Sequence, residues 1–262
     1  MATLGSQAVG SIVKLNVNGT ARNFIVVHQG LPSTAYDSSC DGTWLLMEDV
    51  YEKRAWDSST TDYENSDIHS YLNNTFINLF DSDIKSVIKQ VKIPYRKGST
   101  GTTVNSGSSG LSTKVFLISY TEIGFSGHTY EVIEGAVLSY FNGADESKRF
   151  AKLNGSNYDW FTRTPVGIYY YDVFSVNSGG FLSSTSYDSS RGVRPALILP
   201  AELEVSDDGT VAVPSGAITG SVNIDGVQRE LTGKGYINIG GVLHELSDSS
   251  VNIGGTLKSS KG

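Results

Sequence analysis

YDWFTRTPVGIYYYDVFSVNSGGFLSSTSYDSSRGVRPALILP, residues Tyr158 to Pro200, joins two apolar ends through a polar and aromatic middle. Between Val166 and Arg191, 17 of 26 residues are Tyr, Ser, Asn, Asp or Gly. Selected binding surfaces use these residues because Tyr provides broad, stiff contact area while Ser, Asn and Gly provide adaptable hydrogen bonds. An ordinary solvated hairpin has a similar composition. The run Tyr169–Tyr171 favours a binding surface, because at least one of three consecutive strand residues points away from the core.

Two arginines stand inside the apolar ends of this stretch, Arg163 in WFTRTP and Arg194 in GVRPALILP. In a structural interpretation, each is partly buried and pairs with a carboxylate or with backbone carbonyls. In a functional interpretation, each makes a bidentate contact with a ligand. The structural interpretation is preferred for Arg194, and both interpretations stay open for Arg163.

The chain of 262 residues has room for one large domain, or for one domain with a small appendage. Its net charge of −7 and the lack of a basic stripe argue against binding to nucleic acid. No apolar run reaches the roughly 18 residues of a membrane span, and the N-terminus does not resemble a secretory signal. If the protein works outside the cell, we therefore expect it to leave by lysis or through a dedicated machine.

Local patterns predict several elements. Asn18-Gly19 predicts the turn of a hairpin over Ser11 to His28. Ser66 is a good N-cap for a helix that ends near Phe80. The remaining expected elements are a strand from Trp44, a second helix from Asp81 or Ser82, a mobile loop from Lys97 to Ser112, a strand from Val115 to Ser119 and a short helix within Glu131 to Phe141.

The sequence beyond Pro200 contains a short repeat. Residues 222–231, 237–246 and 251–258 align at offsets of 15 and 14, and Leu15 to Phe24 fits the same template. Each repeat reads as two short strands joined by an Asp-Gly or Gly-Gly turn. The predicted organisation is therefore a domain over residues 1–205 and a β-hairpin repeat tail over residues 206–262, used for attachment or oligomerisation.

Motifs for catalysis and metal binding are missing. The four histidines are dispersed, no G-x-S-x-G or Walker sequence occurs, and Cys40 has no nominated base. We therefore predict a protein without enzymatic activity, cofactor or metal. Acid pairs such as Glu131 with Glu134, or Asp172 with Asp188, leave a glycan-cleaving enzyme as a less favoured alternative.

The motifs WFTRTP at Trp160 and GVRPALILP at Gly192 resemble the closing segment of a family of bacterial and phage domains of unknown function. The similarity also includes WLL at Trp44, SDIHSYLN at Ser66 and VKIP at Val91, and it extends over residues 10 to 200. The resemblance implies a C-type-lectin-like fold of the α+β class, with two helices packed on twisted antiparallel sheets. That fold is similar to formylglycine-generating-enzyme domains and to the variable proteins of diversity-generating retroelements.

In those variable proteins, the last hairpin displays the ligand-binding residues. By this resemblance, and with two residues of the WFTRTP motif added, we expect a set of ligand-binding residues in and next to the hairpin. They are Trp160, Arg163, Tyr169, Tyr170, Tyr171, Asp172, Phe174, Asn177, Ser183, Ser184, Ser186, Tyr187, Asp188 and Arg191. The sequence lacks the calcium triplets of sugar-binding C-type lectins and the paired cysteines of sulfatase-activating enzymes. The resemblance therefore implies neither calcium-dependent sugar binding nor that oxidation chemistry.

These observations predict a phage virion protein that binds a host-surface glycan or protein, as a tail or head fibre does. The repeats resemble phage structural proteins, and we expect them to contact other virion proteins or copies of the chain in a homo-oligomer. The alternative is a structural virion component, a capsid decoration or fibre-joining protein, whose hairpin contacts neighbouring subunits. Neither hypothesis involves nucleic acid or membrane insertion.

Overall fold

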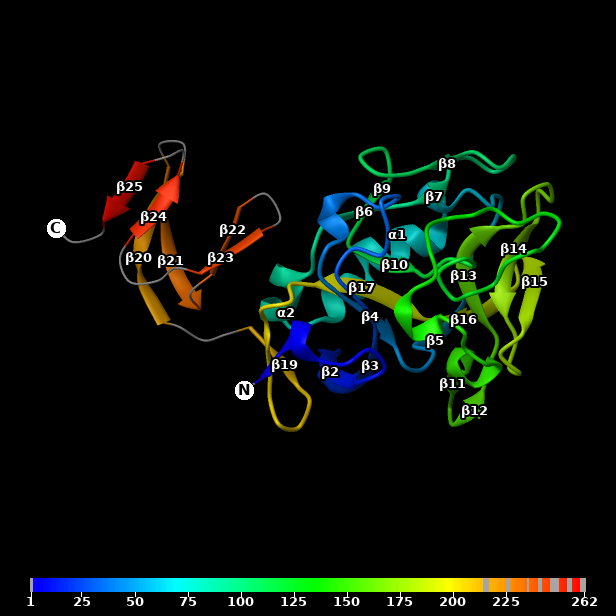
Figure 1. Ribbon diagram of the computed structural model, residues 1–262, viewed down its shortest axis with the longest axis horizontal. Helices are drawn as coiled ribbons and strands as arrows, with labels where there is room; N and C mark the ends of the chain where they lie inside the picture. The colour runs from blue at the N-terminus through cyan, green and yellow to red at the C-terminus, as the bar shows by residue number, and fades with distance from the viewer. Residues whose placement is uncertain are drawn as a thin grey trace.

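The structure is a computed structural model. It describes residues 2–213, together with the backbone of residues 217–224, 227–234, 236–239, 242–245, 250–253 and 256–259. The part up to residue 213 is built from two five-stranded sheets, one three-stranded sheet, three two-stranded sheets and short helices (Figure 1). It is mainly β-structure, and this agrees with the α+β class predicted from the sequence.

The first sheet is antiparallel throughout and contains the opening hairpin. Its strands have the order β10 (Val115–Leu117), β17 (Pro195–Leu199), β4 (Thr43–Met47), β3 (Thr20–Gln29) and β2 (Ile12–Val17). Asn18 and Gly19 form the β2–β3 turn with φ of 52° and 69°. Asn and Gly tolerate this left-handed conformation better than other residues, so the turn fixes the hairpin register with Val17 opposite Thr20. The predicted hairpin is confirmed.

Both faces of the first sheet are buried. On β4, Leu45 and Met47 face one hydrophobic core, while Trp44 and Leu46 face the other. The first core is completed by the helical segment from Ile68 to Ile88, and the second by the segment around Phe141. This explains why the central strands read as continuous apolar runs rather than as an alternating pattern.

The predicted helices are present. Ser66 caps α1 (Asp67–Asn74), because its Oγ accepts from the backbone N–H of His69 at 3.3 Å. After Thr75 the chain continues as the 3-10 helix η4 (Phe76–Leu79), and α2 (Ser82–Val87) follows. The other 3-10 helices are η1 (Leu4–Ser6), η2 (Ser38–Cys40), η3 (Tyr63–Asn65), η5 (Ser139–Phe141) and η6 (Glu146–Arg149).

The second sheet contains most of the stretch from Tyr158 to Pro200. Its order is β15 (Leu182–Ser186), β14 (Asp172–Val176), β13 (Trp160–Pro165), β16 (Ser190–Val193) and β5 (Glu52–Ala55). Its neighbours are antiparallel except β13 and β16, which run parallel with Trp160 opposite Gly192. The GVRPALILP motif leaves this sheet after β16 and enters the first sheet as β17, so it connects the two sheets.

The segment from Lys97 to Ser112 is more ordered than the sequence predicts. β7 (Tyr95–Arg96) pairs with β8 (Val104–Asn105), and β6 (Val91–Ile93) pairs with β9 (Leu111–Thr113). Gly110 permits the second pairing, because a Cβ there would lie 2.7 Å from the carbonyl oxygen of Ile93. Glycine in this segment predicts a loop, but at position 110 it lets two backbones approach each other.

Further short strands close the main unit. β11 (Lys152–Leu153) pairs with β12 (Ser156–Asn157), and a three-stranded sheet has the order β1 (Ala2–Thr3), β18 (Glu204–Val205) and β19 (Val211–Ala212). The domain boundary expected between residues 205 and 206 therefore falls inside this sheet. Its three strands tie residues up to Ala212 to the N-terminal segment.

Beyond residue 216 the structure describes three antiparallel strand pairs. They are β20 (Ala217–Ile224) with β21 (Val227–Lys234), β22 (Tyr236–Ile239) with β23 (Val242–Glu245), and β24 (Ser250–Ile253) with β25 (Thr256–Ser259). The Asp-Gly and Gly-Gly turns predicted between these strands lie outside the described residues. Across the described part of the chain, no helix is long and apolar enough to cross a membrane.

Candidate binding surface

The three consecutive tyrosines lie in the loop between β13 and β14. Tyr169, Tyr170 and Tyr171 are 47%, 64% and 65% exposed, and the neighbouring Ile168 is 55% exposed. The sequence placed this run on a strand with at least one side chain outward. The loop conformation instead exposes all three, because the turn in which the Tyr169 N–H donates to the Val166 carbonyl interrupts the strand alternation.

Both flanks of the tyrosine loop are held by other aromatic residues. The Tyr130 and Tyr169 rings meet edge to face, with centroids 5.3 Å apart and an interplanar angle of 88°. On the other flank, the Tyr171 and Tyr187 ring centroids are 6.0 Å apart, and the Tyr187 N–H donates to the Tyr171 carbonyl at 2.8 Å. We call Ile168, Tyr169, Tyr170, Tyr171, Tyr130 and Tyr187 the tyrosine surface.

The backbone of the loop is fixed at Gly167. Its N–H donates to the Tyr130 carbonyl at 2.9 Å, and a Cβ at position 167 would lie 2.9 Å from that same oxygen. This close approach requires glycine. The loop is therefore bonded directly to the neighbouring segment.

A buried arginine joins the loop to two other segments. The Arg96 side chain is fully buried, and its Nη1 donates to the carbonyls of Gly167 and Gly101, each at 3.3 Å. Its Nη2 donates to Thr61 Oγ1 at 3.2 Å. Burial lowers the pKa of Arg96 to about 10, while the Glu134 carboxylate acts in the opposite direction, so the guanidinium is charged at neutral pH. Arg96 thus fixes the base of the tyrosine loop.

Phe174 supports the surface from below rather than contributing to it. It is 1% exposed, and its ring packs against Tyr120 at 4.8 Å and against His128 at 5.0 Å. His128 in turn contacts Tyr130 with a centroid distance of 5.9 Å. Phe174 was expected to contact a ligand, but its side chain is almost completely enclosed and lies beneath the surface.

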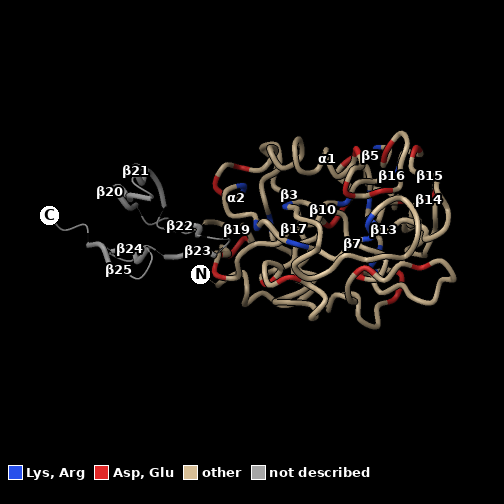
Figure 2. The backbone as a smooth tube through the Cα atoms, turned by 90° about the horizontal axis from the view of Figure 1, so that it is seen from above, with Lys and Arg blue, Asp and Glu red and all other residues tan. Residues whose placement is uncertain are grey.

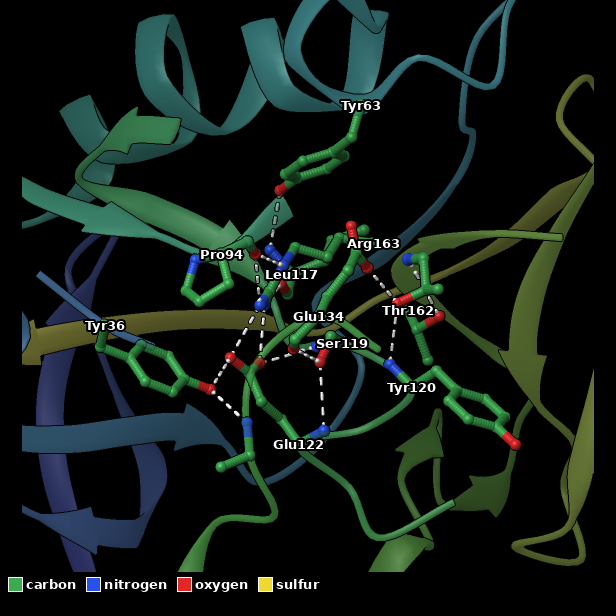
Figure 3. A network of polar contacts seen from close by, with 12 residues as sticks. Tyr36, Tyr63, Pro94, Leu117, Ser119, Tyr120, Glu122, Glu134, Thr162 and Arg163 are labelled. Atoms are coloured by element: carbon green, nitrogen blue, oxygen red, sulfur yellow. Dashed lines mark hydrogen bonds and ion pairs between the residues drawn. The ribbon is translucent and has the colours of Figure 1, made fainter. Parts of the chain in front are cut away.

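Arg163 is likewise inside the protein and not at the surface. Its Nη1 and Nη2 donate to the two oxygens of Glu122 at 2.6 and 2.7 Å, and further bonds reach the carbonyls of Leu117 and Pro94 (Figure 3). Burial lowers the pKa of Arg163, but the charge of Glu122 outweighs this effect and the net shift is upward. The guanidinium holds β13 against β10 and the Pro94 segment, so the structural interpretation replaces the ligand contact.

Glu122 completes this interior network. Besides Arg163, it accepts from the Tyr36 hydroxyl and from the Ser119 N–H, each at 2.8 Å (Figure 3). The nearby Glu134 is also fully buried and accepts from the Thr164 hydroxyl and the Arg96 N–H. The acid pair Glu131 and Glu134 therefore does not line an open site, because one of its members is enclosed.

Trp160 is the third predicted contact that the structure places in the interior. It is fully buried, and its indole N–H donates to the Arg149 carbonyl at 2.9 Å. The apolar ends of the opening stretch therefore form framework, as their composition suggests. A ligand contact by Trp160 would require the core to open.

Most of the remaining predicted residues lie at the two ends of the second sheet. Asp172 and Ser186 are cross-strand partners next to the tyrosine loop, and the turn after β15 adds Asp188. Asn177 lies at the opposite end, where its side chain accepts from the N–H groups of Gly179 and Phe181 and so stabilises a turn. Ser183 and Ser184 lie on β15 between these ends, and Arg191 faces Asp159 at 3.6 Å at the far end.

Sequence reasoning missed three members of this region: Tyr130, Ile168 and the supporting Arg96. Tyr130 stands in GHTYEVIEG, where aromatic and apolar residues are mixed with polar ones between two glycines, and this composition was the available signal. Arg96 follows Pro94 and gave no signal of its partners, which lie far away in sequence.

Figure 2 shows Lys and Arg scattered over several elements of the described chain, in agreement with the missing basic stripe.

The described residues contain no group of three or more His, Cys, Asp or Glu side chains that could hold a metal ion. Cys40 is buried, and burial raises the pKa of its thiol to about 12.

Comparisons with curated proteins and with solved structures find no match. A family model matches residues 41–201, more than half of the chain, and this span includes the whole opening stretch. The chain therefore belongs to the family described as Domain of unknown function (DUF6273).

Proposed function

We propose that this chain is a non-enzymatic binding protein and that the tyrosine surface is its recognition site. The observation that supports the proposal is the exposure of Tyr169, Tyr170 and Tyr171 on a loop whose base is fixed by buried contacts. Exposed aromatic side chains that cluster on a surface are typical of interaction sites.

The fixed base matters for affinity. A flexible loop loses conformational entropy when it binds, at about 0.5–1.5 kcal/mol for each immobilised side chain. The bonds from Gly167 to Tyr130 and from Arg96 to Gly167 hold the backbone before any partner arrives. Tyr also has few rotatable bonds, so its side chain loses little freedom on contact.

The wider setting of the proposal comes from the resemblance in the sequence. We propose a C-type-lectin-like fold for the main unit, in which the β13–β14 loop displays the recognition residues. The chain would serve as a receptor-binding protein of a phage virion, and the strand pairs from Ala217 to Ser259 would attach it or assemble copies. Several copies in one particle would bind a host-surface glycan or protein more firmly than one copy.

The alternative is a structural virion component. In this case the same exposed tyrosines would contact neighbouring subunits instead of a host receptor, since burial of aromatic side chains stabilises either kind of interface. The two hypotheses differ in what the surface contacts, and one set of variants distinguishes them.

The test replaces Tyr169, Tyr170 and Tyr171 together with Ala and measures binding to a panel of bacterial cells and purified envelope glycans. A matched control replaces three exposed apolar residues of the N-terminal segment, Val9, Ile12 and Leu31, with Ser. We expect the tyrosine variant to lose binding while it stays folded, with an unfolding midpoint lowered only by the loss of the ring contacts with Tyr130 and Tyr187, and the control to retain binding. Loss of oligomers instead of cell binding would support the structural alternative, and unchanged binding and assembly would refute both.

A further inference from the structure

Three of the four edges of the two five-stranded sheets are protected. In the first sheet, β2 is bridged to Thr210 and to Phe80. At its other edge, β10 is covered by α1, because the side-chain amide of Asn73 bonds to the carbonyl and N–H of Val115 at 2.9 and 3.2 Å. In the second sheet, the edge strand β5 carries charge, since residues 52–54 are Glu, Lys and Arg. Covering segments and charged side chains both keep a foreign strand from pairing with an edge.

The fourth edge, β15, has neither kind of protection. Its sequence is LSSTS, without a charged residue or a proline. It pairs with β14 in one continuous register from Leu182 to Ser186, and Figure 1 shows it on the outer side of β14, away from β13. Such an edge offers unpaired backbone N–H and C=O groups to another strand.

The bonds between β14 and β15 show which backbone groups of β15 face outward. The Tyr187 N–H donates to the Tyr171 carbonyl at 2.8 Å, and the Asn177 N–H donates to the Phe181 carbonyl at 2.9 Å. Opposite residues of an antiparallel pair alternate between pairs that share hydrogen bonds and pairs that do not. The residues whose N–H and C=O groups point away from β14 are therefore Leu182, Ser184 and Ser186.

These outward groups are almost all available. The Ser186 carbonyl accepts from the Ser189 N–H at 3.0 Å in the turn that follows, and a carbonyl can accept a second bond. The other N–H and C=O groups of these three residues have no partner in the part of the chain that the structure describes. Ser184, in the middle of the strand, is exposed.

Two copies of this edge are complementary to each other. A two-fold axis pairs two identical edge strands in antiparallel orientation. With the axis at Ser184, the N–H of Ser184 in each copy meets the carbonyl of Ser184 in the other, and Leu182 lies opposite Ser186. Residues 181–187 carry no charge, so two chains of net charge −7 can pair here without bringing carboxylates together.

The same pairing brings exposed aromatic side chains together. Phe181 is 55% exposed and precedes β15, while Tyr187 follows it. In this register, Phe181 of one copy lies opposite Tyr187 of the other in a pair without hydrogen bonds, where side chains approach each other most closely. One such contact at each end of the paired strands buries apolar area that a single chain leaves exposed.

We propose that β15 pairs with β15 of a second copy of this chain, antiparallel around Ser184, so that the second sheets of the two copies form one continuous sheet. The inference goes beyond the proposed function, because Tyr169 and Tyr170 lie in the β13–β14 loop, outside the paired strands. Its test measures mass and cross-linking instead of ligand binding, so either proposal can fail without the other.

The first test measures the mass of the full chain by sedimentation velocity over a range of micromolar concentrations. The expected particle is a dimer of the 28.1 kDa chain. A wild-type chain that stays monomeric would overturn the proposal. The same result would follow if β15 paired with an extended segment of a different protein.

Variants at Ser184 assign the dimer to this edge. Ser184→Pro removes the outward N–H and blocks the edge with its ring, while the bonds to β14 do not use this group. Ser184→Lys places two like charges side by side at the axis, which should weaken the dimer at least about tenfold and less at high salt. Because Ser184 is exposed, the lysine variant does not disturb the core and keeps the test decisive if the proline variant does not fold.

The matched control is Ser184→Thr, which keeps the backbone N–H and adds a neutral side chain that suits a strand. It is expected to form dimers as the wild-type chain does. Association of wild-type strength in both the proline and the lysine variants would place the contact elsewhere and reject this interface.

Oxidative cross-linking tests the register. Cys40 is the chain's single cysteine and is buried, so it gives no background. Ser184→Cys places two thiols at the axis on Cα atoms about 5.5 Å apart, within the reach of a disulfide. Ser178→Cys is the control, because Ser178 is exposed in the β14–β15 turn and its two copies would lie more than about 20 Å apart. We expect a covalent dimer from Ser184→Cys alone, and equal cross-linking of both variants would contradict the pairing.

Discussion

Replacement of Arg163 with Met separates a framework role from a ligand-binding role. Methionine retains the apolar stem, but the variant loses both bonds to Glu122, one bond to the Leu117 carbonyl and two contacts to the Pro94 carbonyl. Glu122 keeps only its bonds from Tyr36 and Ser119 in a site with no solvent exposure. The variant therefore leaves a buried carboxylate without its cation.

The expected loss of stability is large. Removal of one partner of a buried ion pair costs about 3–5 kcal/mol, because the remaining charge is uncompensated. A whole domain is typically stable by about 5–15 kcal/mol, so Arg163→Met should lose a third or more of the unfolding free energy. The double variant Arg163→Met, Glu122→Met removes both charges and should be more stable than the single variant.

Urea unfolding, followed by far-ultraviolet circular dichroism and tryptophan fluorescence, measures these differences. The comparison requires that the unfolding free energy depends on urea concentration with the same slope in all variants. A loss below about 1 kcal/mol in Arg163→Met would refute the framework role. So would a double variant that is less stable than the single one. If Arg163 instead contacted a ligand, its replacement would abolish binding while the unfolding free energy stayed the same.

Three further outcomes are expected. Gly167→Ala should lose about 1–3 kcal/mol in urea unfolding and weaken binding through the tyrosine surface, because its Cβ would meet the Tyr130 carbonyl. Ser66→Ala should lose about 1 kcal/mol, because α1 loses its N-cap, and circular dichroism should show less helix. Burial raises the pKa of Glu134 above 4.5, so the folded state binds this proton more tightly than the unfolded state. Stability should therefore fall as the pH rises from 4.5 through the folded pKa, and Glu134→Gln should flatten that slope in unfolding measured from pH 4 to 8.

The sequence predicted those features whose cause is local. Asn18-Gly19 determines a turn through its own backbone preference, and Ser66 caps a helix that starts at the next residue. The apolar runs of the central strands also predicted burial, because both of their faces pack against a core. Such features depend on residues only a few positions apart, so no tertiary contact was needed to find them.

Features that depend on distant residues were not predictable in this way. From the sequence, Arg163 and Phe174 are candidates for ligand contacts at the surface. In the fold, Arg163 pairs with Glu122, which is 41 residues away, and Phe174 packs against Tyr120. Gly110 indicated a loop until β9 was paired with β6. In each case a residue type suits two environments, and only the tertiary fold selects one of them.

The proposed surface could change without loss of the fold, because its backbone and its side chains have different roles. The tyrosine loop is fixed through its main chain: the N–H and carbonyl of Gly167 bond to Tyr130 and Arg96. The outermost side chains, Tyr170 and Tyr171, are about two-thirds exposed and contribute little to the core. A substitution at Tyr170 should therefore alter the partner while leaving stability within about 0.5 kcal/mol of wild type, whereas a substitution at Tyr171 also loses the ring contact with Tyr187. A surface that carries recognition in its side chains and stability in its backbone can present different residues on one framework.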